Sequence, residues 1–298
     1  MPTSRRSDIE TVYRAHAELR AETLITSLRI TDPGEIDVED IAMTQGALVL
    51  EGGLTGAEAR LTHSPRLSFI RVNSSIRERG RRRFAIGHEI GHLLLHKGCS
   101  LFTICEQSSV LLFHSSDQKE IEANFFAAAL LMPRTLFEAP CRKTSPSLDL
   151  VGQLAASFQV SLTAASMRYI EFCPHRCCVV VSTKGRIRYH RRTEDFGYFL
   201  QSSDQVRPAS YAADLFVGES IPSGIRSVSA EAWLEGPNID GSKRILEHSI
   251  AMPNYDSVLT LLWIDKDIDR NVTGEDEGDA EQDASDAGWS WNRYRREE

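Results

Sequence analysis

Two histidines and a glutamate share one short motif, His88-Glu89-x-x-His92, inside an apolar run that extends from Arg83 to His96. Residues four apart on a helix lie on the same face, so both imidazoles can reach a single metal ion. Glu89 lies one position around the helix, where its carboxylate can accept a proton from a water molecule that the ion has acidified. The spacing therefore predicts a catalytic metal site with Glu89 as general base, and it favours a metallopeptidase.

The competing interpretation is a chance occurrence of the motif on an ordinary helix, and the apolar helical context argues against it. His96 continues the four-residue spacing. At a rise of 1.5 Å per residue it lies about 12 Å along the axis from His88, too far to share an ion with bonds of about 2 Å. We expect His96 to be solvated or to lie outside the metal's own ligands.

A third ligand must come from another segment, and the helical run from 120 to 133 offers Glu120 and Glu122. Glu120 and Asn124 are four apart and share a face, so Asn124 can hydrogen-bond a ligating histidine if Glu120 binds the metal. Glu122 points about 200° away from Glu120 around the helix. We therefore favour Glu120 as the ligand and expect Glu122 to be a solvated charge.

The two segments together resemble the ImmA/IrrE family of bacterial metallopeptidases. The first is Arg81-x-Arg83-Phe84-x-Ile86-x-His88-Glu89-x-Gly91-His92-Leu93-Leu94-Leu95-His96, and the second is Glu120-x-Glu122-Ala123-Asn124-x-Phe126-Ala127-Ala128-x-Leu130-Leu131-Met132-Pro133. The resemblance covers about residues 30 to 172. Family members often have Thr-Ile-Ala before the first ligand, where this chain has Ala85-Ile86-Gly87, a small departure that leaves the chemistry intact.

The resemblance implies a cytoplasmic, gluzincin-like endopeptidase that uses zinc, with manganese as the alternative metal. Its substrate would be a helix-turn-helix transcriptional repressor, in which a limited cut derepresses stress-response or mobile-element genes. By the same resemblance His88, His92 and Glu120 are the metal ligands and Glu89 is the base. IrrE-type proteins add a helix-turn-helix-like segment and a GAF-like sensor domain.

The expected fold class is α+β. We expect a zincin-like metallopeptidase domain over 1–140 with a small antiparallel sheet between Ala47 and Asn73, and an edge strand at 67–72 on which an extended substrate could pair. A helix-turn-helix-like segment would follow over 141–176, then a small α/β domain over 177–266, in which 178–190 forms a hairpin and 258–264 a buried strand. At the start of the chain, Ser7 and Glu10 predict a capping box, and Val12 and Leu19 belong to the expected apolar helix face.

The segment from Leu148 to Phe172 predicts two short helices with Ser161 as the second cap. Arg168 is its only cation between Leu148 and Ile170, whereas DNA binding depends on neutralising phosphates with Lys and Arg. We therefore expect scaffolding or partner docking, and no direct nucleic-acid binding. Two alternatives stay open: a DNA-binding regulator with a decayed peptidase fold, and a sensor whose metal is non-catalytic.

Net charge is −8, and residues 267 to 286 hold nine Asp or Glu against one Arg, so the rest of the chain is balanced. Such a segment cannot bury enough apolar surface to order itself, and we expect 267–298 to be an acidic disordered tail. The apolar runs are too short for a membrane span, which favours the cytoplasm.

The six cysteines are expected to be reduced and to have structural roles, with a redox-sensing thiol as the minor hypothesis. The Cys173-Pro174-His175-Arg176-Cys177-Cys178 run lacks the spacing of a paired zinc knuckle.

Overall fold

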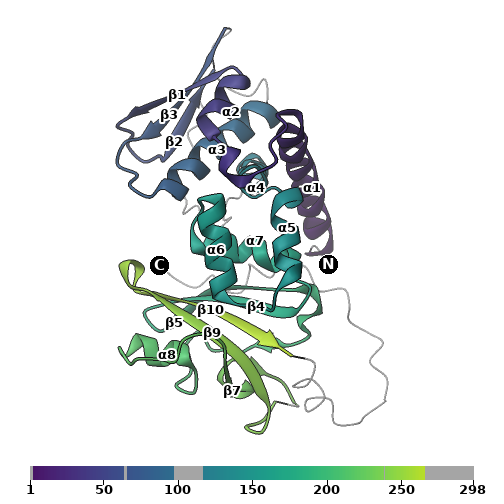
Figure 1. Ribbon diagram of the computed structural model, residues 1–298, viewed down its shortest axis with the longest axis vertical. Helices are drawn as coiled ribbons and strands as arrows, with labels where there is room; N and C mark the ends of the chain where they lie inside the picture. The colour runs from purple at the N-terminus through teal and green to yellow at the C-terminus, as the bar shows by residue number, and fades with distance from the viewer. Residues whose placement is uncertain (1–2, 64–65, 97–116, 238, 266–298) are drawn as a thin grey trace.

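The computed structural model describes residues 3–63, 66–96, 117–237 and 239–265, and it combines helices with three β-sheets (Figure 1). This confirms the mixed α+β class. Its helices are α1 Thr3–Ser27, α2 Val38–Thr44, α3 Arg79–Leu95, α4 Gln118–Leu131, α5 Arg134–Lys143, α6 Leu148–Phe158, α7 Leu162–Phe172 and α8 Tyr211–Phe216. Its strands are β1 Ala47–Gly52, β2 Ala59–Thr62, β3 Ser68–Asn73, β4 Arg176–Thr183, β5 Arg186–Arg192, β6 Phe199–Leu200, β7 Arg226–Ser229, β8 Leu234–Glu235, β9 Arg244–Met252 and β10 Ser257–Ile264. The predicted acidic tail lies outside the described residues.

The first sheet has the order β1-β3-β2, with β3 parallel to β1 and antiparallel to β2. The prediction of a purely antiparallel sheet was therefore wrong. The chain reverses direction between β1 and β2 and again before β3, so β1 and β3 run in the same direction. Because β3 lies between β1 and β2, β1 and β3 are neighbours and pair in parallel. The expected edge strand at 67–72 was also wrong, because β3 is the central strand. The open edges belong to β1 and to β2, which packs against α3.

Helices α3 and α4 pack closely, and small residues line their contact. A Cβ added at Gly91 would lie 3.1 Å from the Cα and 3.2 Å from the carbonyl oxygen of Ala123. At Gly87 the added Cβ would lie 3.5 Å from the Cβ of Ala127, an ordinary van der Waals contact. The close approach therefore depends on Gly91 far more than on Gly87.

Helix α1 packs against α4 and begins at Thr3, four residues before the predicted cap at Ser7. Its buried face includes Ala17, Ala21 and Ile25. Val12 and Leu19, which we expected on that face, are exposed. Small alanines let α1 approach α4, and the sequence pattern alone did not separate them from the larger apolar residues that point outward.

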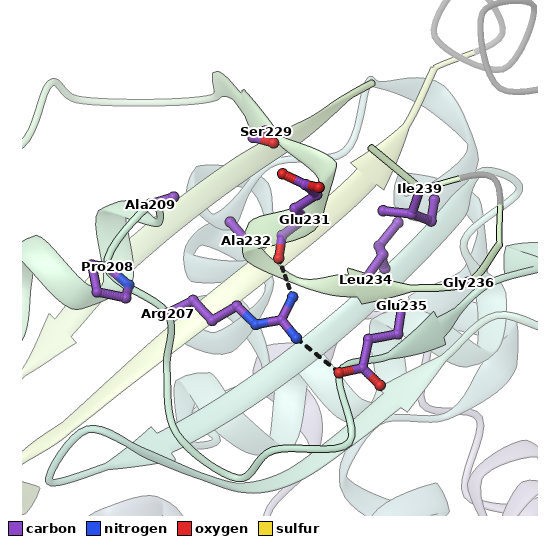
Figure 2. Close-up of a pocket in the computed structure, with 10 residues that line it drawn as sticks. All are labelled: Arg207, Pro208, Ala209, Ser229, Glu231, Ala232, Leu234, Glu235, Gly236 and Ile239. Atoms are coloured by element: carbon purple, nitrogen blue, oxygen red, sulfur yellow. Dashed lines mark hydrogen bonds and ion pairs between the residues drawn. The ribbon is translucent and has the colours of Figure 1, made fainter. Parts of the chain in front are cut away.

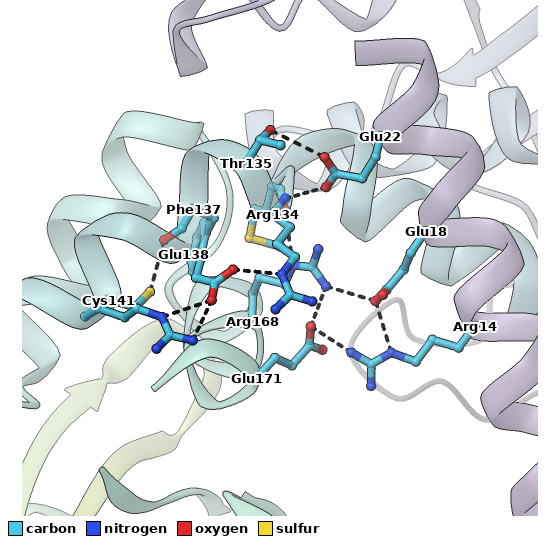
Figure 3. A network of polar contacts seen from close by, with 12 residues as sticks. Arg14, Glu18, Glu22, Arg134, Thr135, Phe137, Glu138, Cys141, Arg168 and Glu171 are labelled. Atoms are coloured by element: carbon cyan, nitrogen blue, oxygen red, sulfur yellow. Dashed lines mark hydrogen bonds and ion pairs between the residues drawn. The ribbon is translucent and has the colours of Figure 1, made fainter. Parts of the chain in front are cut away.

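A polar network joins α1 and α4 to the C-terminal half (Figure 3). Glu171 on α7 forms ion pairs with Arg14 of α1 at 2.8 Å, with Arg168 of its own helix, and with Arg191 of β5 at 2.6 Å. Arg168 also donates to the carbonyl of Met132, directly after α4, at 3.1 Å. A carboxylate that is 11% exposed thus holds three arginines from three elements.

Helices α6 and α7 form the predicted pair. Ser147 and Ser161 cap them by accepting hydrogen bonds from the backbone of Leu150 and Ala164, which confirms Ser161 as the second cap. Gln159 ends α6 in the left-handed region with φ 55°. The turn between the helices is therefore tight.

A five-stranded antiparallel sheet with the order β5-β4-β10-β9-β7 follows. Alternate residues of β4 enter two cores because successive side chains point to opposite faces. Cys177, Val179 and Val181 join the core that also contains the helices. Cys178 and Val180 join a second core on the far side. The sheet is thus buried on both faces, and one face belongs to the same core as α6 and α7.

The predicted hairpin and buried strand of this sheet are confirmed. Lys184 and Gly185 have φ of 51° and 74°, the left-handed conformation that a tight two-residue hairpin needs, and they connect β4 to β5. The strand expected at 258–264 is β10, which lies at the centre of the sheet between β4 and β9.

The glycines of α3 can be tested as a matched pair. Both Gly87→Ala and Gly91→Ala gain helix propensity of about 1 kcal/mol, but only the second crowds the backbone of α4. We expect Gly91→Ala to have a free energy of unfolding lower than Gly87→Ala by about 1–3 kcal/mol. Chemical denaturation of both variants measures the difference, and equal stability would show that α4 can move away at no cost.

Glu171 gives a second stability prediction. Burial raises its pKa, but Arg191, Arg168 and Arg14 outweigh burial and lower the pKa to about 2. A carboxylate with a lowered pKa stabilises the fold fully at pH values above its pKa in the unfolded chain, near 4.5. This stabilisation is lost as the pH falls from there toward 2. We expect Glu171→Gln to cost about 3 kcal/mol at neutral pH and less as the pH decreases through this range.

The control is Glu39→Gln, which removes a half-exposed partner of Arg82. A surface pair contributes up to about 1 kcal/mol, so this variant should stay near the parent protein. Urea denaturation at several pH values compares them, and a Glu171 effect that is constant from pH 7 to pH 3 would contradict the assignment.

Candidate functional site

The two motif histidines lie on the buried side of α3. His88 is 9% exposed and His92 is 3% exposed, and their ring centroids are 4.6 Å apart. Neighbouring apolar residues such as Ile86, Ile90 and Leu93 are buried in the core and fix this face of the helix. The helix therefore presents both imidazoles in the same direction, toward α4.

Glu120 of α4 completes a cluster of three. His88 Nε2 lies 3.0 Å from His92 Nε2, and the Glu120 carboxylate oxygens lie 3.1 Å from His88 Nε2 and 3.2 Å from His92 Nε2. Tetrahedral zinc with bonds of about 2.05 Å holds neighbouring ligand atoms roughly 3.3 Å apart. The donor set and its spacing fit one divalent ion. Among the described residues, this is the only group of three or more His, Cys, Asp or Glu side chains whose ligand atoms all lie within 4.8 Å of one another.

The charges of the cluster support metal binding. Burial raises the pKa of Glu120, but hydrogen bonds from His88 and His92 outweigh it and hold the pKa well below its usual range. Burial lowers the pKa of His92, whereas Glu120 and Glu89 together raise that of His88 in spite of burial. The carboxylate is thus ionised, and neutral imidazole, the form that binds metals, is favoured at His92.

The opposite ring nitrogens contact residues outside the cluster. His88 Nδ1 lies 2.9 Å from Asn124 Oδ1, the arrangement expected from the sequence. His92 Nδ1 lies 3.0 Å from His96 Nδ1, and His96 Nε2 lies 3.2 Å from Glu122 Oε2. One proton arrangement satisfies all of these contacts: His88 and His92 carry protons on Nδ1, and His96 carries its proton on Nε2. With an ion bound in place of the Nε2 contacts to Glu120, both Nε2 atoms would then offer it a lone pair.

Glu122 was wrongly expected to be solvated, since it is 7% exposed and accepts from Gln118 at 2.9 Å as well as facing His96. Its carboxylate faces His96, which itself contacts His92. That direction leads toward the end of α3, where the helix stops at Leu95 and His96 folds back onto His92. The only sequence signal was the repeated four-residue spacing of the histidines.

Glu89 follows His88 on α3 and is 0% exposed. Its negative charge, together with Glu120, raises the pKa of His88 in spite of burial. Two further histidines could take part in the reaction by residue type alone. His175 packs against the ring of Trp263 at 5.6 Å, and His114 lies outside the described residues.

Several arginines of the described residues form contacts within the protein. Arg168 is 3% exposed and bound to Glu18 and Glu171. Arg81 pairs with Glu58 at 2.7 Å, and Arg83 donates to the carbonyl of Ile36 at 2.9 Å. These arginines hold elements together; Arg83 and Arg168 are buried, whereas the Arg81 side chain stays 45% exposed. Within the described residues, each helix is too short or too polar to traverse a lipid bilayer.

A pocket lies in the C-terminal half, between β8 and the segment before α8 (Figure 2). Arg207, one of its charged lining residues, donates to Glu235 at 2.8 Å and to the carbonyl of Glu231. The guanidinium already has partners in the pocket wall. The pocket holds none of the residues of the histidine cluster and points to no particular ligand.

Comparisons with known proteins find a likeness in structure and a match to a family model. The chain resembles a Mycobacterium tuberculosis transcriptional regulator of known structure, with a TM-score of 0.54 and 17% identity over 92% of this chain and 83% of that chain. At this identity the likeness shows a shared fold. A search of curated protein sequences gave no match. Residues 43–169 match the family model Peptidase M78, described as the IrrE N-terminal-like domain. These residues contain α3 and α4, so this part of the chain is similar to the IrrE N-terminal-like domain of the M78 peptidases, and the match supports a function of the metallopeptidase type.

Proposed function

We propose that this protein is a zinc-dependent endopeptidase that makes a limited cut in a helix-turn-helix transcriptional repressor. The observation that carries the proposal is the triangle of two imidazole nitrogens and one carboxylate, with sides of 3.0–3.2 Å, beside the buried Glu89. A divalent ion held there would polarise the scissile carbonyl and acidify a water molecule. Manganese is the alternative metal.

The roles of the protein groups follow from their positions. His88, His92 and Glu120 would hold the ion, and Asn124 would orient His88. Glu89 would accept a proton from the attacking water and deliver it to the leaving amide nitrogen. Its burial favours this role, because a carboxylate away from bulk solvent is a stronger base and holds its proton until the leaving group needs it.

The substrate class rests on the family resemblance, which also implies a cytoplasmic protein acting on stress-response or mobile-element genes. We propose the domain organisation given by the sequence: a zincin-like peptidase domain over 1–140, a helix-turn-helix-like segment over 141–176, and a GAF-like sensor domain over 177–266. The burial of Arg168 argues against DNA binding by the helical segment, because that side chain cannot reach phosphates. A docking or scaffolding role for α6 and α7 agrees with their place in the shared core.

Glu89→Gln tests the catalytic role. Purified protein loaded with zinc is incubated with a helix-turn-helix repressor, chosen from the genes beside its own where one is encoded there, and we expect a single discrete cut. The substitution should reduce the cleavage rate by about 10²–10⁴-fold, since amide cannot accept the proton, while zinc content and thermal unfolding stay close to the parent protein. The exposed Glu51→Gln is the control. Unchanged cleavage in Glu89→Gln would instead indicate a structural metal.

His96→Leu tests the contact behind His92. The change removes both ring nitrogens, so His92 Nδ1 loses its acceptor, and we expect zinc affinity to fall by about 10–100-fold. Chelator competition measures this affinity, and thermal unfolding of the metal-free protein checks the fold. His16→Leu, at an exposed position of α1, should bind zinc as the parent protein does. Equal affinity in His96→Leu and His16→Leu would show that His96 does not orient the ligand.

A further inference from the structure

A pair of thiols lies where α7 ends and β4 begins, apart from the histidine cluster. Cys173 follows the last residue of α7 and Cys177 belongs to β4, with three residues between them. Their Sγ atoms are 3.6 Å apart. Neither is in a disulfide, and both belong to the four free cysteines of the described residues.

We propose that Cys173 and Cys177 form a reversible disulfide when the protein meets a hydroperoxide. A disulfide needs an S–S distance of about 2.05 Å, so the sulfurs must approach by roughly 1.6 Å, which rotation of the two side chains can provide. The inference does not depend on the peptidase proposal, because neither thiol takes part in it.

The surroundings give the two thiols different roles. Cys173 is partly exposed, and its Sγ lies 3.3 Å from the Tyr169 hydroxyl. Hydrogen bonding with Cys177, and also with Tyr169, lowers the pKa of Cys173 to about 7 in spite of burial. Cys177 is fully buried, and burial raises its pKa well above the usual value. Cys173 is therefore the thiolate that an oxidant can reach, and Cys177 is the thiol held beside it.

The chemistry balances in two steps. The Cys173 thiolate attacks one oxygen of the hydroperoxide, an S–O bond forms, the O–O bond breaks, and hydroxide or alkoxide leaves. Cys177 sulfur then attacks the sulfenic sulfur, the S–O bond breaks, and the departing hydroxide takes the Cys177 proton as water. Two electrons pass from the sulfurs to the peroxide, and a dithiol reductant reverses the reaction.

The position of the pair gives the bond a mechanical effect. Cys177 pairs in register with Trp263 of β10, and Cys173 donates its backbone N–H to Tyr169 in the last turn of α7. The disulfide would therefore tie the end of α7 to the central strands of the sheet. Glu171, which binds Arg14 of α1, lies two residues before Cys173.

The other cysteines of the described residues are poorer candidates. Cys178 lies on the opposite face of the sheet, in the second core, and burial raises its pKa strongly. Cys141 is buried and donates to the carbonyl of Phe137 at 3.1 Å, and burial raises its pKa to about 12. Cys178 thus serves as a matched control, adjacent in sequence but pointing away.

The test uses the full chain, reduced, treated with hydrogen peroxide, alkylated, and digested with trypsin without reduction. Trypsin cuts after Arg176, between the two cysteines, so the disulfide joins two peptides that otherwise separate. We expect mass spectrometry to find Tyr169–Arg176 linked to Cys177–Lys184. The link should vanish with dithiothreitol and in Cys173→Ser, and it should persist in Cys178→Ser.

A second measurement keeps the proposal testable if Cys177→Ser is unstable or the link is transient. Dimedone traps sulfenic acid, and we expect label at Cys173 of the parent protein at early times and stable label at Cys173 in Cys177→Ser. The proposal is overturned if Cys173 pairs with Cys99, Cys105 or Cys141, if it proceeds to sulfinic acid while Cys177 stays reduced, or if neither thiol reacts under conditions that oxidise a free cysteine.

Discussion

The distance between α3 and α4 is the constraint on which the candidate site depends. Gly91 faces Ala123 so closely that a single methyl group would lie 3.1 Å from the neighbouring backbone. His92 follows Gly91, and Glu120 lies one turn before Ala123, so the same contact that packs the helices brings imidazole and carboxylate within 3.2 Å. Ligand spacing of this kind cannot be adjusted by side-chain rotation alone, because each ring is buried.

The same two helices also supply the groups behind the cluster. Asn124 and Glu122 come from α4, and His96 caps α3. Each imidazole is therefore fixed on both sides, by the cluster at Nε2 and by a polar partner at Nδ1. Helix α1 packs against α4, and strands β2 and β3 of the first sheet pack against α3. The arrangement is preorganised in the sense that few rotatable groups remain to be ordered.

The sequence predicted what local spacing encodes. His88, Glu89 and His92 follow from one helical turn, Glu120 and Asn124 from another, and the hairpin at Lys184-Gly185 and the cap at Ser161 from turn and cap chemistry. The order β1-β3-β2 was missed because alternation along a strand says which face is buried and nothing about which strand lies beside it. Glu122 was missed because a buried charge depends on a partner from another helix, here His96. The exposure of Val12 and Leu19 was missed because alanines, not large side chains, meet α4.

The burial of the five-stranded sheet on both faces has a mechanical consequence. Val179 and Leu259 pack into the core that contains Tyr169 and Phe126, so the sheet and the helices have no flexible tether between them. A rearrangement within the sheet cannot be absorbed by a hinge and must displace α7. Because Arg168 of α7 donates to the carbonyl of Met132 at the end of α4, a displacement of α7 would also shift α4, the helix that carries Glu120.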